Sequence, residues 1–262
     1  MRHEIKESEK EGTEIMQIRY FKEYSQYLDR DMEFKMYGYA GRLCLVIPCQ
    51  DGRFFEWEDR HMFEILSPFI DAGRIQFVTV DSVDLESWSS YEATAPRMQM
   101  QENWVQYVMN ELLPSAHYKA GKPENEPVMV MGASMGAFHA ANLFFRFPDT
   151  FTQVLALSGL YDMSIYFYDG NVDFNAYQNN PCGYLENMDP GHDYIQKYNA
   201  AQAIFVVGQG AWEHECSVDL GKLADVCWRK GIHIEPQFWG YDIPHDWPSW
   251  EQQIQVYVPQ MC

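Results

Sequence analysis

The chain has 262 residues, of which 47% are hydrophobic and 16% aromatic, so it contains enough apolar material for a substantial core. Nineteen Lys and Arg residues against 38 Asp and Glu residues give a formal net charge of −19. Because this field repels polyanions, nucleic acid and anionic membrane surfaces are not expected as partners.

The first residues and the cysteines indicate the compartment. Residues 1–14 are too polar for a secretory signal and are expected to be a flexible start, and no apolar run approaches the roughly 18 residues that span a bilayer. The six cysteines are scattered without CxxC pairs, which indicates reduced thiols. The sequence therefore predicts a cytoplasmic protein. Since no repeat or linker interrupts residues 1–262, it also predicts a single domain.

The expected strands begin with two segments, 16–28 and 32–39, in which apolar and polar residues alternate. With the turn residues 29–31 between them, they predict an antiparallel hairpin at a sheet edge. Short, nearly continuous apolar runs follow, and such runs are typical of parallel strands buried on both faces. These runs lie at 43–48, 74–80, 127–131, 153–158 and 203–208, with 232–239 as a candidate last strand.

Segments of helical period lie between these runs, at 58–69, 95–113, 135–147, 218–230 and 250–258. The alternation predicts a doubly wound α/β fold, a mostly parallel sheet with helices on both faces. Residues 161–198 are the exception, since they are rich in Tyr, Phe, Asn and Asp without a strand pattern. We expect an irregular insertion that forms a binding or lid-like element, with a plain surface excursion as the alternative.

The stretch Gly-Ala-Ser-Met-Gly at 132–136 stands between an apolar strand and a helix of small residues. A serine hydroxyl becomes a useful nucleophile only when a base removes its proton and the backbone projects it toward the substrate. The pattern Gly-x-Ser-x-Gly in a strand-turn-helix context provides that projection. Ser134 is therefore the candidate nucleophile, and an idle serine in a tight turn is the alternative.

A histidine near the end of the chain is expected as the base, because hydrolases of this kind run in the order Ser, acid, His. His245 lies in WGYDIPHDWPSW, between the candidate last strand and the last helix. His192 lies in the insertion and is a weaker candidate. The other histidines lie in the start of the chain or within or beside helices.

The acid is expected after the strand at 203–208, in GQGAWEHECSV. Glu213 is the preferred candidate, while Glu215 and Asp162 remain open. The same segment could suggest a metal site made by His214, Glu215 and Cys216. Adjacent residues of an extended chain point to opposite sides, and no HExxH or CxxC pair accompanies them, so no metal is expected.

An oxyanion hole needs two backbone amides directed at the developing negative charge. Met135, directly after the candidate nucleophile, is expected to provide one amide. The loop CQDGR after the strand at 43–48 is expected to provide the other, from Gln50 or, as the near alternative, from Cys49.

Together, GASMGAFHAANLFFRFPDTF, LALSGLYD, GQGAWE and PHDWPSW resemble the esterase family of the α/β-hydrolase superfamily, whose members include esterase D, the antigen 85 mycolyltransferases and feruloyl esterases. The resemblance covers most of the chain after about residue 16. It implies an α/β-hydrolase sheet of about eight strands. It also implies Ser134 as nucleophile, His245 as base, and Met135 and Gln50 as oxyanion amides. Many relatives carry an Asp where this chain has Ala211, which leaves the acid open.

This resemblance implies a serine ester hydrolase that forms an acyl-enzyme, needs no cofactor or metal, and acts on a small or medium ester. The aromatic side chains of the insertion are candidates for a pocket wall. The alternatives are an acyltransferase using the same acyl-enzyme, and a catalytically silent binding module, which the missing Asp at Ala211 favours. A homo-oligomer is compatible with the sequence, which indicates no oligomeric state.

Overall fold

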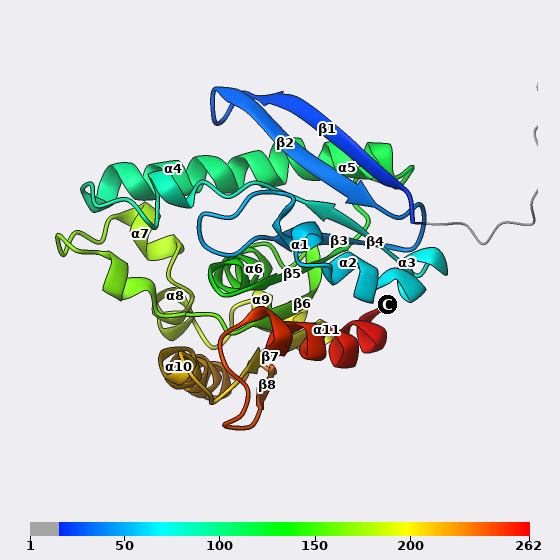
Figure 1. Cartoon of the computed structure of the whole chain (residues 1–262). Helices are drawn as coiled ribbons and strands as arrows, with labels where there is room; N and C mark the ends of the chain where they lie inside the picture. The colour runs from blue at the N-terminus through cyan, green and yellow to red at the C-terminus, as the bar shows by residue number, and fades with distance from the viewer. Residues whose placement is uncertain (1–15) are drawn as a thin grey trace, which may run out of the picture.

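A computed structural model describes residues 16–262, and the predicted flexible start at 1–14 lies outside them. The core of the fold is an eight-stranded sheet in the order β1-β2-β4-β3-β5-β6-β7-β8 (Figure 1). β1 and β2 form an antiparallel hairpin, β2 pairs antiparallel with β4, and all other pairs are parallel. The strands are β1 (Ile18–Ser25), β2 (Arg30–Tyr37), β3 (Arg42–Ile47), β4 (Ile75–Thr79), β5 (Val128–Ala133), β6 (Phe151–Leu157), β7 (Gln202–Val207) and β8 (Glu235–Phe238). The predicted mostly parallel α/β fold is confirmed.

The central strands are buried on both faces, which explains their continuous apolar sequences. Along β5, Val128 and Val130 pack into one hydrophobic cluster, whereas Met129 and Met131 pack into the cluster on the opposite face. Burial of each large apolar side chain contributes about 1.5–3 kcal/mol relative to exposure. The two clusters therefore fix both the register of the strands and the helices that cover them.

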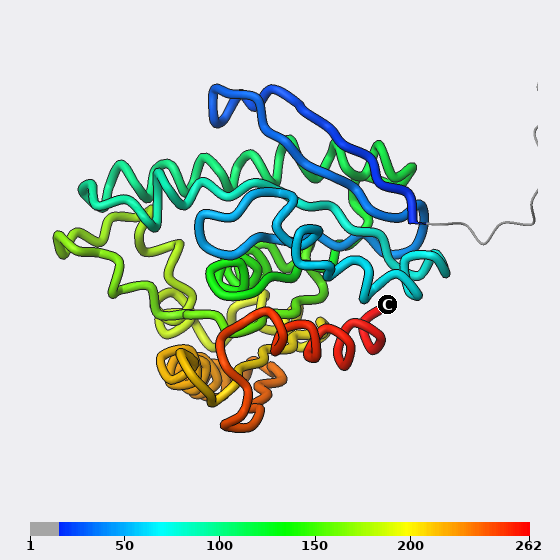
Figure 2. Tube along the Cα trace, viewed as in Figure 1, coloured from blue at the N-terminus to red at the C-terminus, as the bar shows by residue number. Residues whose placement is uncertain are grey.

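Helices cover both faces of the sheet. One face carries α4 (Thr94–Tyr107), α5 (Leu113–Lys119), α6 (Met135–Arg146), α9 (Tyr194–Ala200) and α10 (His214–Lys230). The other face carries α1 (Glu56–Asp59), α2 (Met62–Ile65), α3 (Ser67–Asp71) and α11 (Trp247–Met261). The chain trace in Figure 2 ends close to α3, where the Arg74 guanidinium donates to a Cys262 oxygen at 2.8 Å.

Several expected helices have different bounds in the structure. The segment 58–69 is broken into the three short helices α1, α2 and α3, and His61, at φ +57°, interrupts it in the left-handed region. The helix expected at 95–113 is longer, because α4 continues through a π-helical turn, η2 (Val108–Leu112), into α5. The last two helices start earlier than predicted, at His214 and Trp247.

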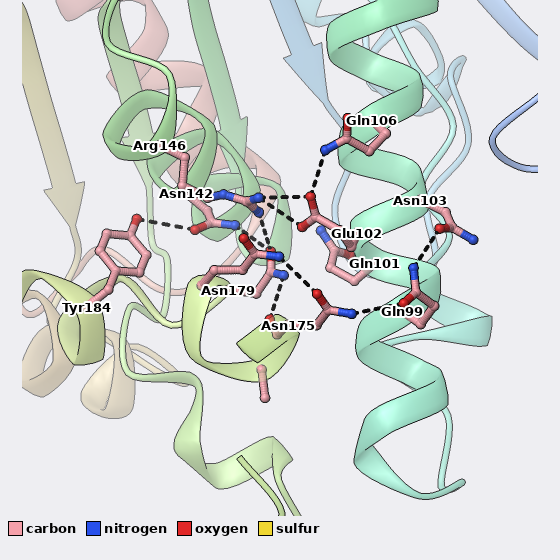
Figure 3. A network of polar contacts seen from close by, with 12 residues as sticks. Gln99, Gln101, Glu102, Asn103, Gln106, Asn142, Arg146, Asn175, Asn179 and Tyr184 are labelled. Carbon is pink, nitrogen blue, oxygen red and sulfur yellow. Dashed lines mark hydrogen bonds and ion pairs between the residues drawn. The ribbon is translucent and has the colours of Figure 1, made fainter. Parts of the chain in front are cut away.

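The insertion at 161–198 contains no strand and folds into short helices. These are a 3₁₀ turn, η3 (Met163–Tyr166), followed by α7 (Phe174–Gln178), α8 (Pro181–Glu186) and α9. Outside the insertion, another 3₁₀ turn, η1 (Asp84–Glu86), precedes α4. Figure 3 shows a polar network that ties α7 and α8 to α4 and α6. In it, the Asn179 side-chain oxygen accepts from Asn142 and from Arg146, and Arg146 also pairs with Glu102 at 2.9 Å. The insertion is therefore fastened to the helical layer by buried polar contacts.

The parallel strands β3, β5, β6 and β7 all end at the same edge of the sheet. In open α/β sheets this carboxyl edge is where ligands bind, because the following loops converge there. The predicted site residues follow directly after these strands. Among residues 16–262, no helix is both long and apolar enough to cross a lipid bilayer.

Candidate active site

Ser134 stands on a sharp turn between β5 and α6. Its backbone has φ +56° and ψ −123°, a conformation that costs free energy for a residue with a side chain. Gly132 and Gly136 make this turn sterically feasible, since a Cβ on Gly132 would lie 2.3 Å from the Gly136 carbonyl oxygen, and a Cβ on Gly136 would lie 2.4 Å from the Pro48 oxygen. The Gly-x-Ser-x-Gly sequence is therefore a consequence of close backbone packing around a projecting serine.

His245 lies on the loop between β8 and α11 and faces Ser134. Its Nε2 atom is 3.0 Å from Ser134 Oγ. The loop is held by its backbone, because the His245 amide donates to the Ala211 carbonyl at 2.9 Å. The imidazole also packs edge-to-face with Trp250, with ring centroids 5.1 Å apart. These contacts fix the position of the ring, while its side chain keeps 21% exposure toward the cavity described below.

Glu213 is the carboxylate that meets this imidazole. Its Oε2 atom lies 3.2 Å from His245 Nδ1, and its side chain is completely buried. The other two candidates have different contacts. Glu215 is exposed and lines the cavity, and Asp162 caps η3 and pairs with Lys222 at 3.4 Å. The geometry therefore brings together Ser134, His245 and Glu213, in one hydrogen-bonded row.

Two further residues, which the sequence reasoning did not single out, orient Glu213. Ser158 at the end of β6 donates its hydroxyl to Glu213 Oε1, and the Gly208 amide donates to the same oxygen at 3.3 Å. The Trp250 indole N–H in turn donates to Ser158 Oγ at 3.0 Å. Ser158 is held at φ +57°, so the chain accepts strain to place a hydroxyl there. A polar residue ending the apolar run QVLALS was the available sequence signal.

In the loop after β3, the amide of Gln50 lies between two residues whose amides bind carboxylates, the partly buried Glu56 and the buried Asp84. The Cys49 amide donates to the Glu56 carboxylate at 2.7 Å, and the Asp51 amide donates to Asp84 at 3.3 Å. Burial raises the pKa of Glu56. Within residues 16–262, neither the Gln50 amide nor the Met135 amide donates to a protein acceptor. Of the two alternatives for the second oxyanion amide, the geometry favours Gln50 over Cys49.

Asp84 also connects this loop to the helix that follows Ser134. Its second oxygen lies 2.9 Å from His139 Nε2, and both side chains are buried. His139 belongs to α6, so the pair bridges the helix that follows Ser134 and the loop that carries Gln50. The two candidate oxyanion amides are thus held relative to each other by a buried contact.

Ser134, His245 and Gln50 border a cavity of about 170 Å³. Its walls combine the polar groups with apolar side chains, among them Met135, Phe138 and Leu160. From the insertion only Tyr166 lines it, while Phe174, Tyr177 and Tyr184 line a separate cavity. Burial raises the pKa of Tyr166 to about 12. Trp212 has a backbone φ of +65°, is 88% exposed overall, and also lines this cavity.

Comparison with known proteins places the chain in a family. A family model described as "Putative esterase" matches residues 25–260. The chain belongs to the Putative esterase family. No curated protein matches the sequence.

Solved structures share the fold of this esterase-family chain at low sequence identity. One is a ferulic acid esterase, at 16% identity and a TM-score of 0.73, covering 94% of this chain and 98% of that one. A fluorophosphonate-binding serine hydrolase from Staphylococcus aureus has 11% identity and a TM-score of 0.71 and covers 94% and 98%. An S-formylglutathione hydrolase from Agrobacterium tumefaciens has 14% identity and a TM-score of 0.70 and covers 94% of each chain. The predicted α/β-hydrolase fold is confirmed.

Proposed function

We propose that this esterase-family protein is a serine carboxylic-ester hydrolase in which Ser134 is the nucleophile, His245 the general base and Glu213 the acid that orients the base. The observation that carries the proposal is the hydrogen-bonded row Ser134–His245–Glu213, with steps of 3.0 and 3.2 Å. A base held between a nucleophile and a buried carboxylate is the arrangement that activates a serine. Family membership supports the same class of reaction.

The reaction takes place in two steps. Glu213 holds the proton on Nδ1 of His245, so the lone pair of Nε2 faces the Ser134 hydroxyl and accepts its proton as Oγ attacks the ester carbonyl. The amides of Met135 and Gln50 stabilise the oxyanion, and the imidazolium then protonates the departing alcohol. Water repeats the sequence on the acyl-enzyme and releases the acid. The mechanism draws on no cofactor.

Glu213 also bears on the missing Asp at Ala211. The carboxylate two residues later, Glu213, makes the contact with His245 that a triad needs. This contact supports an active hydrolase over a silent binding module. A cavity of about 170 Å³ beside Ser134 supports a small or medium ester as substrate. Rates measured on p-nitrophenyl esters of increasing acyl length, on acetylated sugars and on feruloyl esters would identify the acyl group.

A fluorophosphonate probe tests the nucleophile directly, because it reacts only with an activated serine. We expect the wild-type chain to be labelled and the Ser134→Ala variant to remain unlabelled. Ser164 is an exposed serine outside the site, so the Ser164→Ala variant should be labelled like wild type. A wild-type chain that resists the probe would refute the proposal and favour a binding module. Measuring how the acyl group partitions between water and an added alcohol separates hydrolysis from acyl transfer.

A further inference from the structure

The thiol of Cys216 lies beside the proposed acid and base, and the proposed reaction does not use this thiol. On an extended chain the adjacent side chains of this segment would point to opposite sides, so no metal site was predicted there. The segment instead begins α10, with Glu213 as its N-cap, so Glu213 and Cys216 are three residues apart on one helical face. Cys216 Sγ lies 3.9 Å from His245 Nδ1, and its side chain lines the cavity.

Three different ligand atoms therefore converge on one point. The Glu213 carboxylate, the Cys216 sulfur and the His245 imidazole lie within 4.8 Å of one another. In a tetrahedral zinc site, metal–ligand bonds of about 2.0–2.3 Å place neighbouring N, O and S ligands about 3.3–3.6 Å apart. The observed Nδ1–Oε2 and Nδ1–Sγ distances are 3.2 and 3.9 Å, and the three ligand atoms together span up to 4.8 Å. The Nδ1–Oε2 pair is already at the spacing of a zinc site, and a movement of about an ångström by the Cys216 side chain would complete the set.

We propose that Glu213, Cys216 and His245 form an inhibitory site for a thiophilic divalent metal ion, with Zn²⁺ as the best match. The inference rests on the proposed function for its inhibitory effect, but the binding site itself does not. A mixed set of thiolate, imidazole and carboxylate suits zinc and its neighbours in the transition series rather than Mg²⁺ or Ca²⁺. Cys216 and His245 both line the cavity, from which a water molecule could supply a fourth ligand.

The inhibitory effect follows from the chemistry of the imidazole ring. A metal ion bound to Nδ1 takes the lone pair of that nitrogen, so the single proton of the neutral ring must sit on Nε2. Nε2 then donates to Ser134 Oγ and has no lone pair with which to accept the serine proton. Metal binding at the far side of the ring therefore switches off the base without closing the cavity.

The proton balance of binding is simple. Burial and the neighbouring Glu213 raise the pKa of the Cys216 thiol, so the sulfur is protonated when no metal is bound. A bound zinc ion deprotonates a coordinating thiol outright. The ring keeps one proton, which moves from Nδ1 to Nε2 by exchange with water. One proton from Cys216 is thus released for each ion bound, and a chelator reverses the reaction.

The first experiment measures inhibition with the full chain freed of metal by a chelator. Zn²⁺ should inhibit hydrolysis of a p-nitrophenyl ester, EDTA should restore the rate, and Mg²⁺ or Ca²⁺ should have no effect. Cys216→Ala should raise the inhibition constant for Zn²⁺ at least tenfold, with each rate normalised to the same variant without metal. Cys227→Ala, which removes a buried thiol from the same helix, is the matched control and should keep the wild-type constant. Equal inhibition of wild type and Cys216→Ala would overturn the proposal.

The second experiment reads out binding without activity. Co²⁺ bound to a thiolate gives a charge-transfer band in the near ultraviolet, which we expect in wild type and in Ser134→Ala but not in Cys216→Ala. The band in a chain without esterase activity would support the metal site while the proposed function failed. An active chain without the band would overturn the metal site alone.

Discussion

Replacing Glu213 by Gln is the sharpest test of the proposed acid, because the surroundings determine how the new amide is oriented. Glu213 Oε1 accepts from the Ser158 hydroxyl and from the Gly208 amide at 3.3 Å. The Ser158 oxygen already accepts from the Trp250 indole, so its own proton points at residue 213. In Glu213→Gln the atom that receives these two donors must be the amide oxygen. The NH₂ group is then left facing His245 Nδ1.

An NH₂ group in that place forces the wrong tautomer on the imidazole. It donates to Nδ1 across the distance that is 3.2 Å in the wild-type chain, so the ring proton moves to Nε2, which faces Ser134. The base then has no lone pair for the serine proton. Loss of the correct tautomer in a catalytic triad lowers kcat about 10⁴-fold. At 1.36 kcal/mol for each factor of ten, this corresponds to ~5 kcal/mol of transition-state stabilisation.

The assay compares kcat on a p-nitrophenyl ester for wild type, Glu213→Gln and Glu215→Gln, with thermal unfolding as the check that each variant folds. Glu215 is exposed and two residues away, which makes it the matched control, and its variant should stay within about threefold of wild type. A Glu213→Gln variant that keeps a tenth of the wild-type kcat would refute the reasoning. Reversal of the two results would assign the acid to Glu215.

The remaining predictions concern the groups that support the row. Ser158→Ala should lower kcat about tenfold or more with little change in KM, because a hydrogen bond to a buried charged group contributes ~1.5–3 kcal/mol; an unchanged kcat would show that Ser158 does not position the acid. Gln50→Pro removes an amide N–H and should lower kcat by about 10²–10³, while Gln50→Ala keeps the amide and should match wild type in the same assay. The pKa of Glu56 is raised by burial, so wild-type stability falls as pH rises from the unfolded value of 4.5 through the higher folded value. Glu56→Gln keeps an acceptor for the Cys49 amide, and its stability relative to wild type in urea unfolding should therefore grow between about pH 4 and pH 7; a pH-independent difference would contradict this. Glu102→Gln leaves the Arg146 charge without its partner and should lower the free energy of unfolding by ~3 kcal/mol. The expected Tm is about 6–12 °C lower than that of wild type. An unchanged Tm would show that this ion pair of the network in Figure 3 contributes no net stability.

Part of the candidate site could be predicted from local sequence. The glycines that permit a tight turn indicate Ser134, and the Gly- and Pro-rich loop before the last helix indicates His245, which lies 3.0 Å from it in the structure. The candidate oxyanion loop was predicted because Asp51-Gly52 marks a turn directly after a strand. These features are local, so the order of residues is enough to reveal them.

Other features depend on which segments meet in space. Ser158 and Trp250 lie 92 residues apart in the sequence and touch only because β6 ends and α11 begins at the same edge of the sheet. One helix was predicted at 58–69, where the structure has the three short helices α1, α2 and α3. Apolar periodicity does not reveal a residue in the left-handed region, such as His61. Packing sets the backbone conformation at single positions, and the pattern of apolar and polar residues in the sequence does not reveal it.

The sequence by itself determined the fold class, because continuous apolar runs alternating with helical periods leave few alternatives to a parallel sheet covered on both faces. It also determined the tight turn at Ser134, because its glycines permit a close backbone approach. Which of the candidate carboxylates contacts His245 was decided only by the tertiary structure. Glu213, Glu215 and Asp162 are chemically alike and all follow strands that end at one edge. Only the start of α10 and the donors at Ser158 and Gly208 turn one of them toward His245. Hydrogen-bond direction depends on three-dimensional position, and residue type alone does not encode it.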